Sequence, residues 1–255
     1  MTDTTERPEL VHLDVADAVA TITLDSPHNR NALSRQLITE LRAHLATVED
    51  DASVRVVRLV SSGRVFCSGA DLSEASTVPM QEGARAICDL QRQIVALSKP
   101  VVVVVSGAAR AGGIGIVAAA DVAVVAEDAT FALTEVKLGL TPAVISLTVL
   151  PRLTSRAASL TALGGEVFTG AEAAAYGLVT RAVPADQLDA TVDSIVASLA
   201  TGAPQGLAET KKLLNADLLH RIDTGADDLI ELSARLFGSD AAREAMTAFL
   251  SRGKG

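Results

Sequence analysis

The sequence predicts an α/β protein with a largely parallel sheet, followed by a helical C-terminal region. Up to about residue 133, short valine-rich runs alternate with stretches whose apolar residues recur at helical spacing. From about Pro142 onward the pattern is almost wholly helical, apart from a brief strand near Leu178–Val183. Strands that alternate with helices imply right-handed crossovers and helices on both faces of the sheet. We therefore expect an α/β core over residues 1–195 and a helical region over residues 196–255.

The elements of the core follow from local patterns. A β-hairpin is predicted from Val11–Val15 and Val19–Leu24, and Ser34 is expected to cap a helix that reaches about Glu49. A loop over Ser61–Ser76 is expected after the next strand. The remaining core elements are a strand at Val54–Val60, a helix at Glu82–Leu97, a strand at Val101–Val105, a loop at Ala108–Gly113, a short helix from Gly112 to Ala120, and strands at Val122–Val125 and Phe131–Leu133.

The C-terminal part reads as a series of helices. Glycines at positions 164, 165, 177 and 202 are placed where helices are expected to stop. The predicted helices are Ala143–Leu150, Ser155–Leu163, Ala171–Tyr176, Ala185–Leu199, Gln205–Leu219, Asp227–Leu236 and Asp240–Leu250.

Composition excludes several classes of protein. The 255-residue chain is 49% hydrophobic, and its mean hydropathy of +0.33 indicates a well-filled interior. A net charge of −9 argues against nucleic-acid binding, which needs clustered lysine and arginine. Two cysteines, Cys67 and Cys88, make a disulfide framework improbable, and no apolar run is long enough to span a membrane. With no secretory signal pattern at the N-terminus, we expect a cytoplasmic protein.

Two loops lack large side chains and carry the main functional signal. The run FCSGADL (residues 66–72) follows one predicted strand, and the run SGAARAGG (residues 106–113) follows another. Small residues let a backbone approach a ligand closely and present bare N–H groups to it. Two such N–H groups that converge on one point form an oxyanion hole, which stabilises charge that develops on a carbonyl oxygen.

At these residues the chain resembles the enoyl-CoA hydratase/isomerase, or crotonase, superfamily over roughly Val11 to Phe249. The matching segments are SP and RNAL near residues 26–33, FCSGADL, the segment from Lys99 to Gly113, and FALTEVKLGL at residues 131–140. The resemblance implies a ββα superhelix core and a coenzyme A thioester as substrate. It implies no separate cofactor, because coenzyme A is part of the substrate.

The resemblance also assigns roles to residues. The N–H groups of Ala70 and Gly112 are the implied oxyanion donors, Gly112 opens a helix whose N-terminus favours negative charge, and Glu135 is the implied acid–base residue. Asp121 matches an aspartate with a structural role. The helix Glu82–Leu97 is expected to line the acyl tunnel. The residues expected to bind substrate are Arg30, Ala32, Ser68, Ala70, Asp71, Leu72, Gly112, Gly113, Gly115, Leu140 and Phe249.

Position 115 departs from the family pattern. The hydratases of this superfamily typically use two glutamates, and Gly115 stands where the first is expected. A single glutamate can move a proton between two carbons, which is isomerisation, whereas hydration also needs a positioned water. The sequence from Glu135 to Ser146 resembles that of the 3-methylglutaconyl-CoA hydratase branch, whose substrates carry a carboxylate. This resemblance favours a hydratase over an isomerase. If the pocket has room, Gly115→Glu is expected to raise the hydration of crotonyl-CoA.

Rival functions are an enoyl-CoA isomerase and a non-catalytic acyl-CoA-binding protein. The run GIGIVA at residues 113–118 resembles a dinucleotide fingerprint but begins seven residues beyond its strand, which argues against a nicotinamide enzyme. None of the four histidines has the spacing of a metal ligand, so no metal is expected. The resemblance further implies that residues 196–255 help to close the coenzyme A site and build a homotrimer, or a hexamer made of two trimers.

Overall fold

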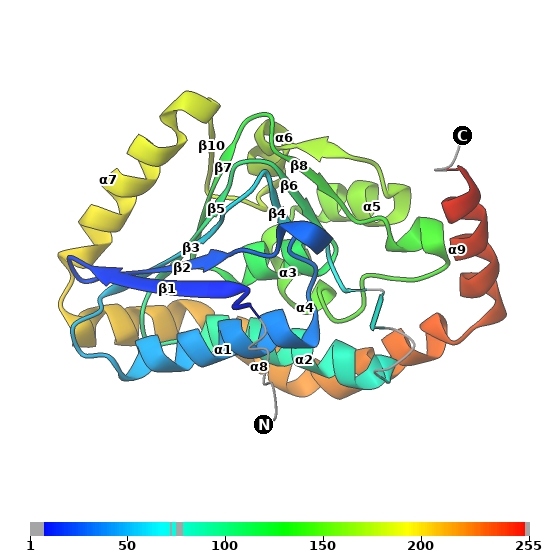
Figure 1. Ribbon diagram of the computed structural model, residues 1–255, viewed down its shortest axis with the longest axis horizontal. Helices are drawn as coiled ribbons and strands as arrows, with labels where there is room; N and C mark the ends of the chain where they lie inside the picture. Colours follow the sequence, from blue (N-terminus) through cyan, green and yellow to red (C-terminus); the bar gives the residue numbers. More distant parts are fainter. Residues whose placement is uncertain (1–7, 72, 75–78, 253–255) are drawn as a thin grey trace, which may run out of the picture.

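The chain repeats a unit of two strands and a helix. The computed structural model describes residues 8–71, 73–74 and 79–252. Two complete units follow the N-terminal hairpin, and a third begins with a further pair of strands (Figure 1). The units are β3 (Val56–Ser61), β4 (Val65–Cys67) and α2 (Met80–Ala96); β5 (Val101–Val105), β6 (Ala108–Arg110) and α3 (Gly112–Ala119); and β7 (Val122–Ala126) with β8 (Thr130–Ala132).

The paired strands belong to two different sheets. The larger sheet has the order β1-β2-β3-β5-β7-β10, and the smaller has the order β4-β6-β8-β9, where β9 is Phe168–Thr169 and β10 is Arg181–Val183. Within the larger sheet only the hairpin of β1 (Val11–Ala16) and β2 (Val19–Leu24) is antiparallel. Because each unit places one strand in each sheet, the chain advances as a ββα superhelix. The predicted fold class is confirmed.

Burial explains why these segments adopt their structures. All five valines of β5 are buried, as expected for a central parallel strand with both faces covered. The helix α1 (Arg35–Asp50) begins where predicted, because the Ser34 side chain accepts a hydrogen bond from the N–H of Leu37. The apolar face of α1, formed by Leu37, Ile38, Leu41, Leu45 and Val48, is buried.

The C-terminal half completes the core and then covers it. Figure 1 shows α1, α2 and α8 (Pro204–Phe237) beneath the larger sheet, with α9 (Asp240–Arg252) at one end of the molecule. None of the helices in the described part of the chain is long and apolar enough to cross a membrane. The remaining elements are α4 (Ser146–Arg152), α5 (Ser155–Gly164), β9 (Phe168–Thr169), α6 (Gly170–Tyr176), β10 (Arg181–Val183), α7 (Leu188–Ala200), α8 (Pro204–Phe237) and α9 (Asp240–Arg252), with short 3₁₀ turns η1 (Pro27–Asn29), η3 (Glu135–Leu138) and η4 (Ala185–Gln187).

Two expectations about the elements are corrected. The loops predicted at 61–76 and 108–113 each contain a strand, β4 and β6, and β9 was also missed. Strands of two or three residues are too short to show an alternating pattern. The two helices predicted at 205–219 and 227–236 form the single helix α8 of 34 residues. Gly225 is tolerated within it because it packs against Leu147 of α4. The proposed division after residue 195 falls inside α7.

A buried polar cluster attaches α8 to the core. The Nζ atom of Lys211 lies 2.7 Å from Oδ2 of Asp121, and Nδ2 of Asn215 donates to Oδ1 of the same carboxylate at 3.0 Å. The N–H of Val101 also donates to Asp121, at 2.7 Å. Lys211 is only 4% exposed. Asp121 therefore joins the start of β5, the end of α3 and the first third of α8.

Candidate active site

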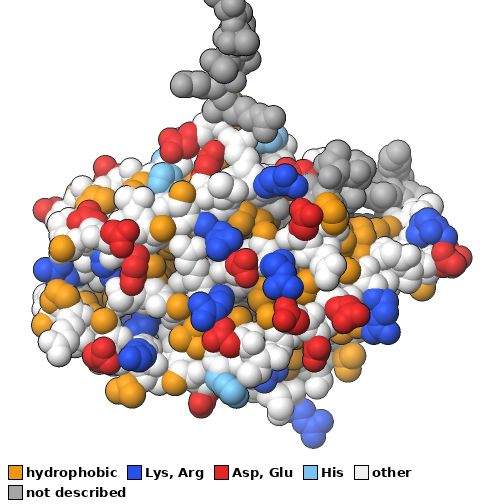
Figure 2. Space-filling model, turned by 90° about the horizontal axis from the view of Figure 1, so that it is seen from below, with side chains coloured by type: hydrophobic (Ala, Val, Ile, Leu, Met, Phe, Trp, Pro, Cys, Tyr) orange, Lys and Arg blue, Asp and Glu red, His pale blue; other side chains and the backbone are white. Residues whose placement is uncertain are grey.

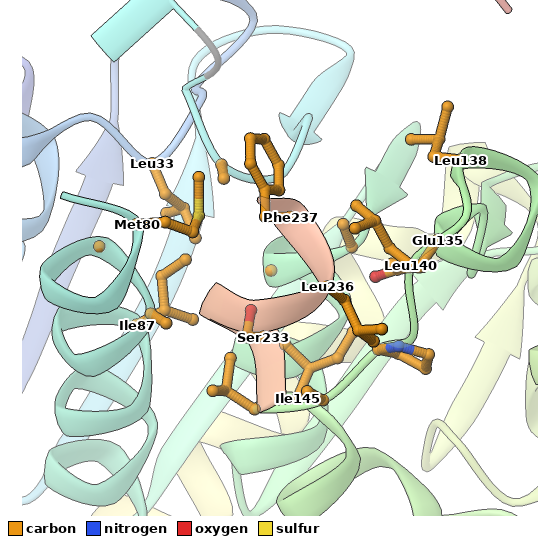
Figure 3. A pocket seen from close by; sticks show the side chains of 18 of the residues that line it. Leu33, Met80, Ile87, Glu135, Leu138, Leu140, Ile145, Ser233, Leu236 and Phe237 are labelled. Carbon is orange, nitrogen blue, oxygen red and sulfur yellow. The ribbon is translucent and has the colours of Figure 1, made fainter. Parts of the chain in front are cut away.

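A cavity of about 240 Å³ lies between the two small-residue loops, α2, η3 and the end of α8. Figure 3 shows side chains from several elements facing this space, with Met80 and Ile87 on one side and Glu135 and Leu140 on the other. Most of the wall is apolar. Such a cavity with a few polar groups is the usual form of a small-molecule site. The apolar side chains include Leu33, Met80, Ala84, Ile87, Leu138, Leu140, Val144, Ile145, Leu236 and Phe237.

The two loops approach each other at their glycines. Gly69 has a φ of +96°, and a Cβ atom placed on it would lie 2.9 Å from Cβ of Ala111. A Cβ atom on Gly112 would lie 2.6 Å from Cδ1 of Leu33. Gly69 has no room for a side chain, and a side chain at Gly112 would require Leu33 to move. The small residues singled out from the sequence therefore bring two backbone segments together on one wall of the cavity.

The N–H groups of Ala70 and Gly112 are available to a ligand. Both residues line the cavity, and neither N–H donates a hydrogen bond to an atom of the described residues. Gly112 is the first residue of α3, where a helix has unpaired N–H groups and a partial positive charge. The preceding Ala111 has φ 43° and ψ −117°, a backbone conformation that costs a non-glycine residue of order 1–3 kcal/mol.

Glu135 begins the 3₁₀ turn that follows β8. Its side chain lines the cavity, and its Oε2 atom is buried without a hydrogen-bond partner among the described residues. Burial raises the pKa of Glu135 from 4.5 to about 6, and a hydrogen bond to its own backbone opposes this shift only in part. The turn ends at Gly139, which has a φ of +70° and packs closely against Ala241 and Ala242 at the start of α9. Glu135 is thus a partly protonated carboxyl group near neutral pH.

Position 115 does not face the cavity. Gly115 is buried in α3, and a Cβ atom on it would lie 2.8 Å from Cγ2 of Ile145 and 2.9 Å from Oε1 of Gln91. Gln91 accepts a hydrogen bond from the Thr148 hydroxyl at 2.6 Å and donates to the carbonyl of Ile87 at 3.2 Å. These contacts join α2, α3 and α4 behind the apolar wall. A second carboxylate at position 115 has no room.

The predicted site residues fall into two groups, those that line the cavity and those that do not. Those that line the cavity are Ser68, Ala70, Asp71, Gly112, Glu135 and Leu140. Ser68 donates to the carbonyl of Asn29 at 3.2 Å, and Asp71 accepts from Asn29 at 2.9 Å, so both also hold the loop. Those that do not line it are Arg30, Ala32, Gly113 and Gly115. Leu72 and the side chain of Phe249 lie outside the described residues.

The expectation that residues 196–255 help to close the site did not identify which residues of α8 line the cavity. Ser233, Leu236 and Phe237 line the cavity from the last turns of this helix. Their spacing of three and four residues places them on one helical face, which is a visible sequence signal. The sequence shows that such a face exists but not what it packs against. Met80 and Ile87 of α2 also line the cavity, and the expectation that this helix borders the acyl chain of the substrate stays a prediction.

Comparison with known proteins places this geometry in a family. The sequence model of the enoyl-CoA hydratase/isomerase family matches residues 14–255. The chain belongs to the enoyl-CoA hydratase/isomerase family. Within this family, it is similar to a protein named probable enoyl-CoA hydratase from Bacillus subtilis, with 31% identity over 254 residues and coverage of 96% of each chain.

Relatives in this family carry names for more than one reaction. The chain is 30% identical to 1,2-epoxyphenylacetyl-CoA isomerase of Escherichia coli, over 96% of each chain. A crystal structure of an enoyl-CoA hydratase from Mycobacterium avium has a TM-score of 0.90 and 44% identity, covering 96% of this chain and 98% of the other. These likenesses extend over nearly the whole family fold. Within the described residues, no group of three or more His, Cys, Asp or Glu side chains is placed to hold a metal ion.

Proposed function

We propose that this protein adds water reversibly to a 2-enoyl-CoA thioester, with Glu135 as the acid–base residue and the N–H groups of Ala70 and Gly112 as the oxyanion hole. The observation that carries the proposal is the buried, unpartnered Oε2 atom of Glu135 in the cavity that these two free N–H groups also line. A carboxylate with a pKa of about 6 can both accept and return a proton near neutral pH.

The chemistry needs two steps. Ionised Glu135 accepts a proton from water while the water oxygen forms a bond to C3 of the substrate. The electron pair of the C2–C3 double bond moves toward the thioester carbonyl, so that negative charge develops on its oxygen. Protonated Glu135 then donates the proton to C2, and the carbonyl and the ionised carboxylate are regenerated. Because one carboxyl group serves both steps, the proton and the hydroxyl add to the same face of the double bond.

The oxyanion hole supplies the electrostatic part of catalysis. Two N–H donors aimed at the developing oxyanion stabilise it more than the neutral carbonyl, and one such donor is typically worth about 10²–10³ in rate. The partial charge at the start of α3 acts in the same direction. The strained backbone of Ala111 fixes the peptide that carries the Gly112 N–H. The donors therefore need little reorganisation during the reaction.

Recognition of the coenzyme A part belongs to the same proposal. We assign Ser68, Asp71 and Leu140 of the cavity wall to substrate binding, and Arg30, Ala32, Gly113 and Gly115, which do not line the cavity, to substrate binding or to support of the binding loops. The same assignment covers Leu72 and Phe249, whose side chains lie outside the described residues. No cofactor is required beyond the coenzyme A of the substrate. The region 196–255 closes the cavity through α8 and builds a homotrimer or hexamer. We also propose a cytoplasmic location.

A second candidate function is Δ3-Δ2-enoyl-CoA isomerisation. The observation that favours it is that position 115 has no room for a glutamate side chain. The described cavity wall therefore presents Glu135 without a second carboxylate from that position. A single proton carrier is sufficient to take a proton from C4 and return it to C2, or the reverse. The same oxyanion hole stabilises the dienolate formed between the two proton transfers.

The test of the proposed function is Glu135→Gln. This change keeps the shape of the side chain and removes its proton-carrying ability, so we expect kcat to fall by about 10²–10⁴. The affinity for a saturated acyl-CoA should change little. Glu166→Gln is the matched control, because Glu166 contacts Lys137 of the same turn at 2.8 Å but does not line the cavity.

Two assays separate the candidates. Hydration removes the conjugated enoyl thioester, whereas isomerisation of a 3-enoyl-CoA creates one. Exchange of the C2 protons of a saturated acyl-CoA in D₂O reports on Glu135 and the oxyanion hole without either reaction. Near wild-type turnover in Glu135→Gln would show that another group carries the proton. Tight acyl-CoA binding with neither turnover nor exchange would identify a non-catalytic binding protein.

A further inference from the structure

The end of α8 borders the cavity and presents one face to it. Figure 3 shows Ser233 and Leu236 at the centre of the view and Phe237 above them, between the Met80–Ile87 side and the Glu135 side. Leu236 and Phe237 extend the apolar wall. Ser233 instead places a hydroxyl group on the same helical face. This position belongs to the acyl part of the cavity, since the wall opposite it is formed by apolar side chains of α2.

The Ser233 hydroxyl has no partner in the described protein. Other helical hydroxyls, such as those of Thr39, Thr161 and Thr224, donate to the carbonyl four residues earlier. Ser233 makes no such bond and no other hydrogen bond to the described residues. A hydroxyl that stays unpaired once a ligand displaces water costs about 1–3 kcal/mol. A ligand that fills the cavity therefore gains by offering a polar atom at this point.

The charges around the cavity favour a neutral polar group over an anion. Glu135, Asp71 and Glu74 contribute carboxylates to the wall. Among the described lining residues the cation is Arg110, and its guanidinium donates to the carbonyl of Ala109 and to Thr130. One hydroxyl cannot compensate the desolvation of an acyl-chain carboxylate beside these acidic groups. A hydroxyl or keto oxygen has a far smaller desolvation cost.

The wall formed by α2 presents apolar residues, Met80, Ala84 and Ile87, to the cavity. Ile87 and Ile145 close it, and the polar atoms behind them are satisfied within the Gln91–Thr148 pair. The hydrocarbon part of an acyl chain can lie along this wall and bury its surface there. Its polar substituent would then face α8, where Ser233 lies.

We propose that Ser233 is a specificity-determining residue that hydrogen-bonds a neutral polar substituent on the acyl chain. The preferred substrates are then acyl-CoA thioesters functionalised with a hydroxyl or keto group, rather than plain alkyl chains. This inference rests on the proposed function, because it assumes that the cavity holds the acyl part of a coenzyme A thioester.

The test compares pairs of saturated acyl-CoA thioesters of equal size. In each pair, the terminal methyl group of one member is replaced by a hydroxyl group in the other, and the pairs cover a series of chain lengths. Saturated thioesters cannot be hydrated, so calorimetry measures binding alone. For at least one chain length we expect the unmodified protein to bind the hydroxyl member about 10-fold more tightly. Ser233→Ala should abolish this preference, and Ser233→Thr, which retains a hydroxyl, should restore part of it.

A matched control is Ser194→Ala on the exposed side of α7, which should leave the preference unchanged. Equal binding of both members at every length by the unmodified protein would overturn the inference while the proposed function stands. An equal loss of affinity for both members in Ser233→Ala would also overturn it, since Ser233 would then act through packing. A protein that binds no acyl-CoA at all would overturn the proposed function together with this inference.

Discussion

The buried carboxyl group of Glu135 lowers the stability of the folded protein once it is ionised. Burial disfavours its ionised form, so its folded-state pKa of about 6 lies above the ordinary value of 4.5. Below the ordinary value the group is protonated in both the folded and the unfolded states. As the pH rises through this interval, the unfolded state loses its proton first and is stabilised relative to the folded state. Glu135 therefore contributes an instability that is fully present above about pH 6.

The raised pKa of Glu135 predicts how the stability of the protein changes when the carboxyl group is removed. Glu135→Gln should raise the free energy of unfolding by about 1–2 kcal/mol at pH 8, because a shift of one pKa unit corresponds to about 1.4 kcal/mol. At pH 4 the two proteins should be nearly equally stable. Urea unfolding at both pH values measures the difference. A variant that is destabilised at pH 8 would show that the carboxylate has a stabilising partner in the folded protein.

The surroundings of Gly115 correct the expectation that a glutamate there could improve hydration. The contacts of a Cβ atom with Ile145 and Gln91, at 2.8 and 2.9 Å, leave no space for a longer side chain. Gly115→Ala should cost about 1–3 kcal/mol of stability through overpacking. Gly115→Glu should cost more, because it also buries a charge, and should not raise crotonyl-CoA hydration. Urea unfolding and a hydration assay measure the two effects, and a stable Gly115→Glu variant with higher activity would contradict the steric argument.

At the residue scale, the sequence predicted three residues of the cavity wall but not the packing around position 115. Ala70, Gly112 and Glu135 were recognised because small-residue loops and a flanking motif mark them, and all three line the cavity. The obstruction at Gly115 could not be predicted, because it depends on Gln91 and Ile145, which are 24 and 30 residues away in the sequence. Contacts between distant segments leave no local pattern.

At the scale of elements, the polar cluster of Lys211, Asp121 and Asn215 joins α8 to the core through a buried ion pair. Removing one partner of a buried ion pair leaves the other charge uncompensated, which typically costs 3–5 kcal/mol. Exposed pairs contribute far less. Figure 2 shows such charges interspersed on the face formed by the helices beneath the larger sheet. The pair of Arg92 and Asp223, 2.6 Å apart and about half exposed, joins α2 to α8 on the exposed side of these helices.

We therefore expect Lys211→Met to lower the free energy of unfolding by about 3 kcal/mol. Arg92→Met, the comparison variant, should lower it by less than about 1 kcal/mol. Urea unfolding of the two variants gives both values. Adding Asp121→Leu to Lys211→Met should recover part of the loss, because no unpaired charge is then buried. Equal effects of the two single variants would mean that the buried cluster contributes no more to stability than the exposed ion pair.

Most elements of the fold could be predicted because their patterns are long. The valine run of β5 and the leucine spacing of α1 each fix an element from local sequence alone. The continuity of α8 could not be predicted in this way, since Gly225 reads as a break until its packing against Leu147 is known. Strands β4 and β6 are likewise defined by their partners across the smaller sheet rather than by their own residues.

At the scale of the whole molecule, some apolar side chains still lie on the surface. Leu160, Leu163 and Val167 are 60%, 75% and 60% exposed, and they lie on α5 and the segment that follows it. Exposed apolar patches often mark contacts between proteins. The homotrimer or hexamer expected from the sequence resemblance stays a prediction, and a face of this kind is where such an assembly would bury surface.

Light scattering coupled to size-exclusion chromatography measures the assembly. We expect a molar mass near three or six times that of the 26.3 kDa chain. Leu163→Glu should lower this mass, because it places a charge within the apolar patch, whereas a glutamate at the exposed Ser194 on α7 should not. A monomeric wild-type protein at micromolar concentration would contradict the prediction.

The continuous helix α8 has a mechanical consequence. At 1.5 Å per residue its 34 residues span about 51 Å, and about 33 Å separate Lys211 from Ser233. If the helix moves as a rigid rod about the Asp121 attachment, a tilt of about 2° moves the cavity end by about 1 Å. Displacements of that size are enough to disturb a positioned substrate. Distance from the cavity is therefore a poor guide to which residues set its shape.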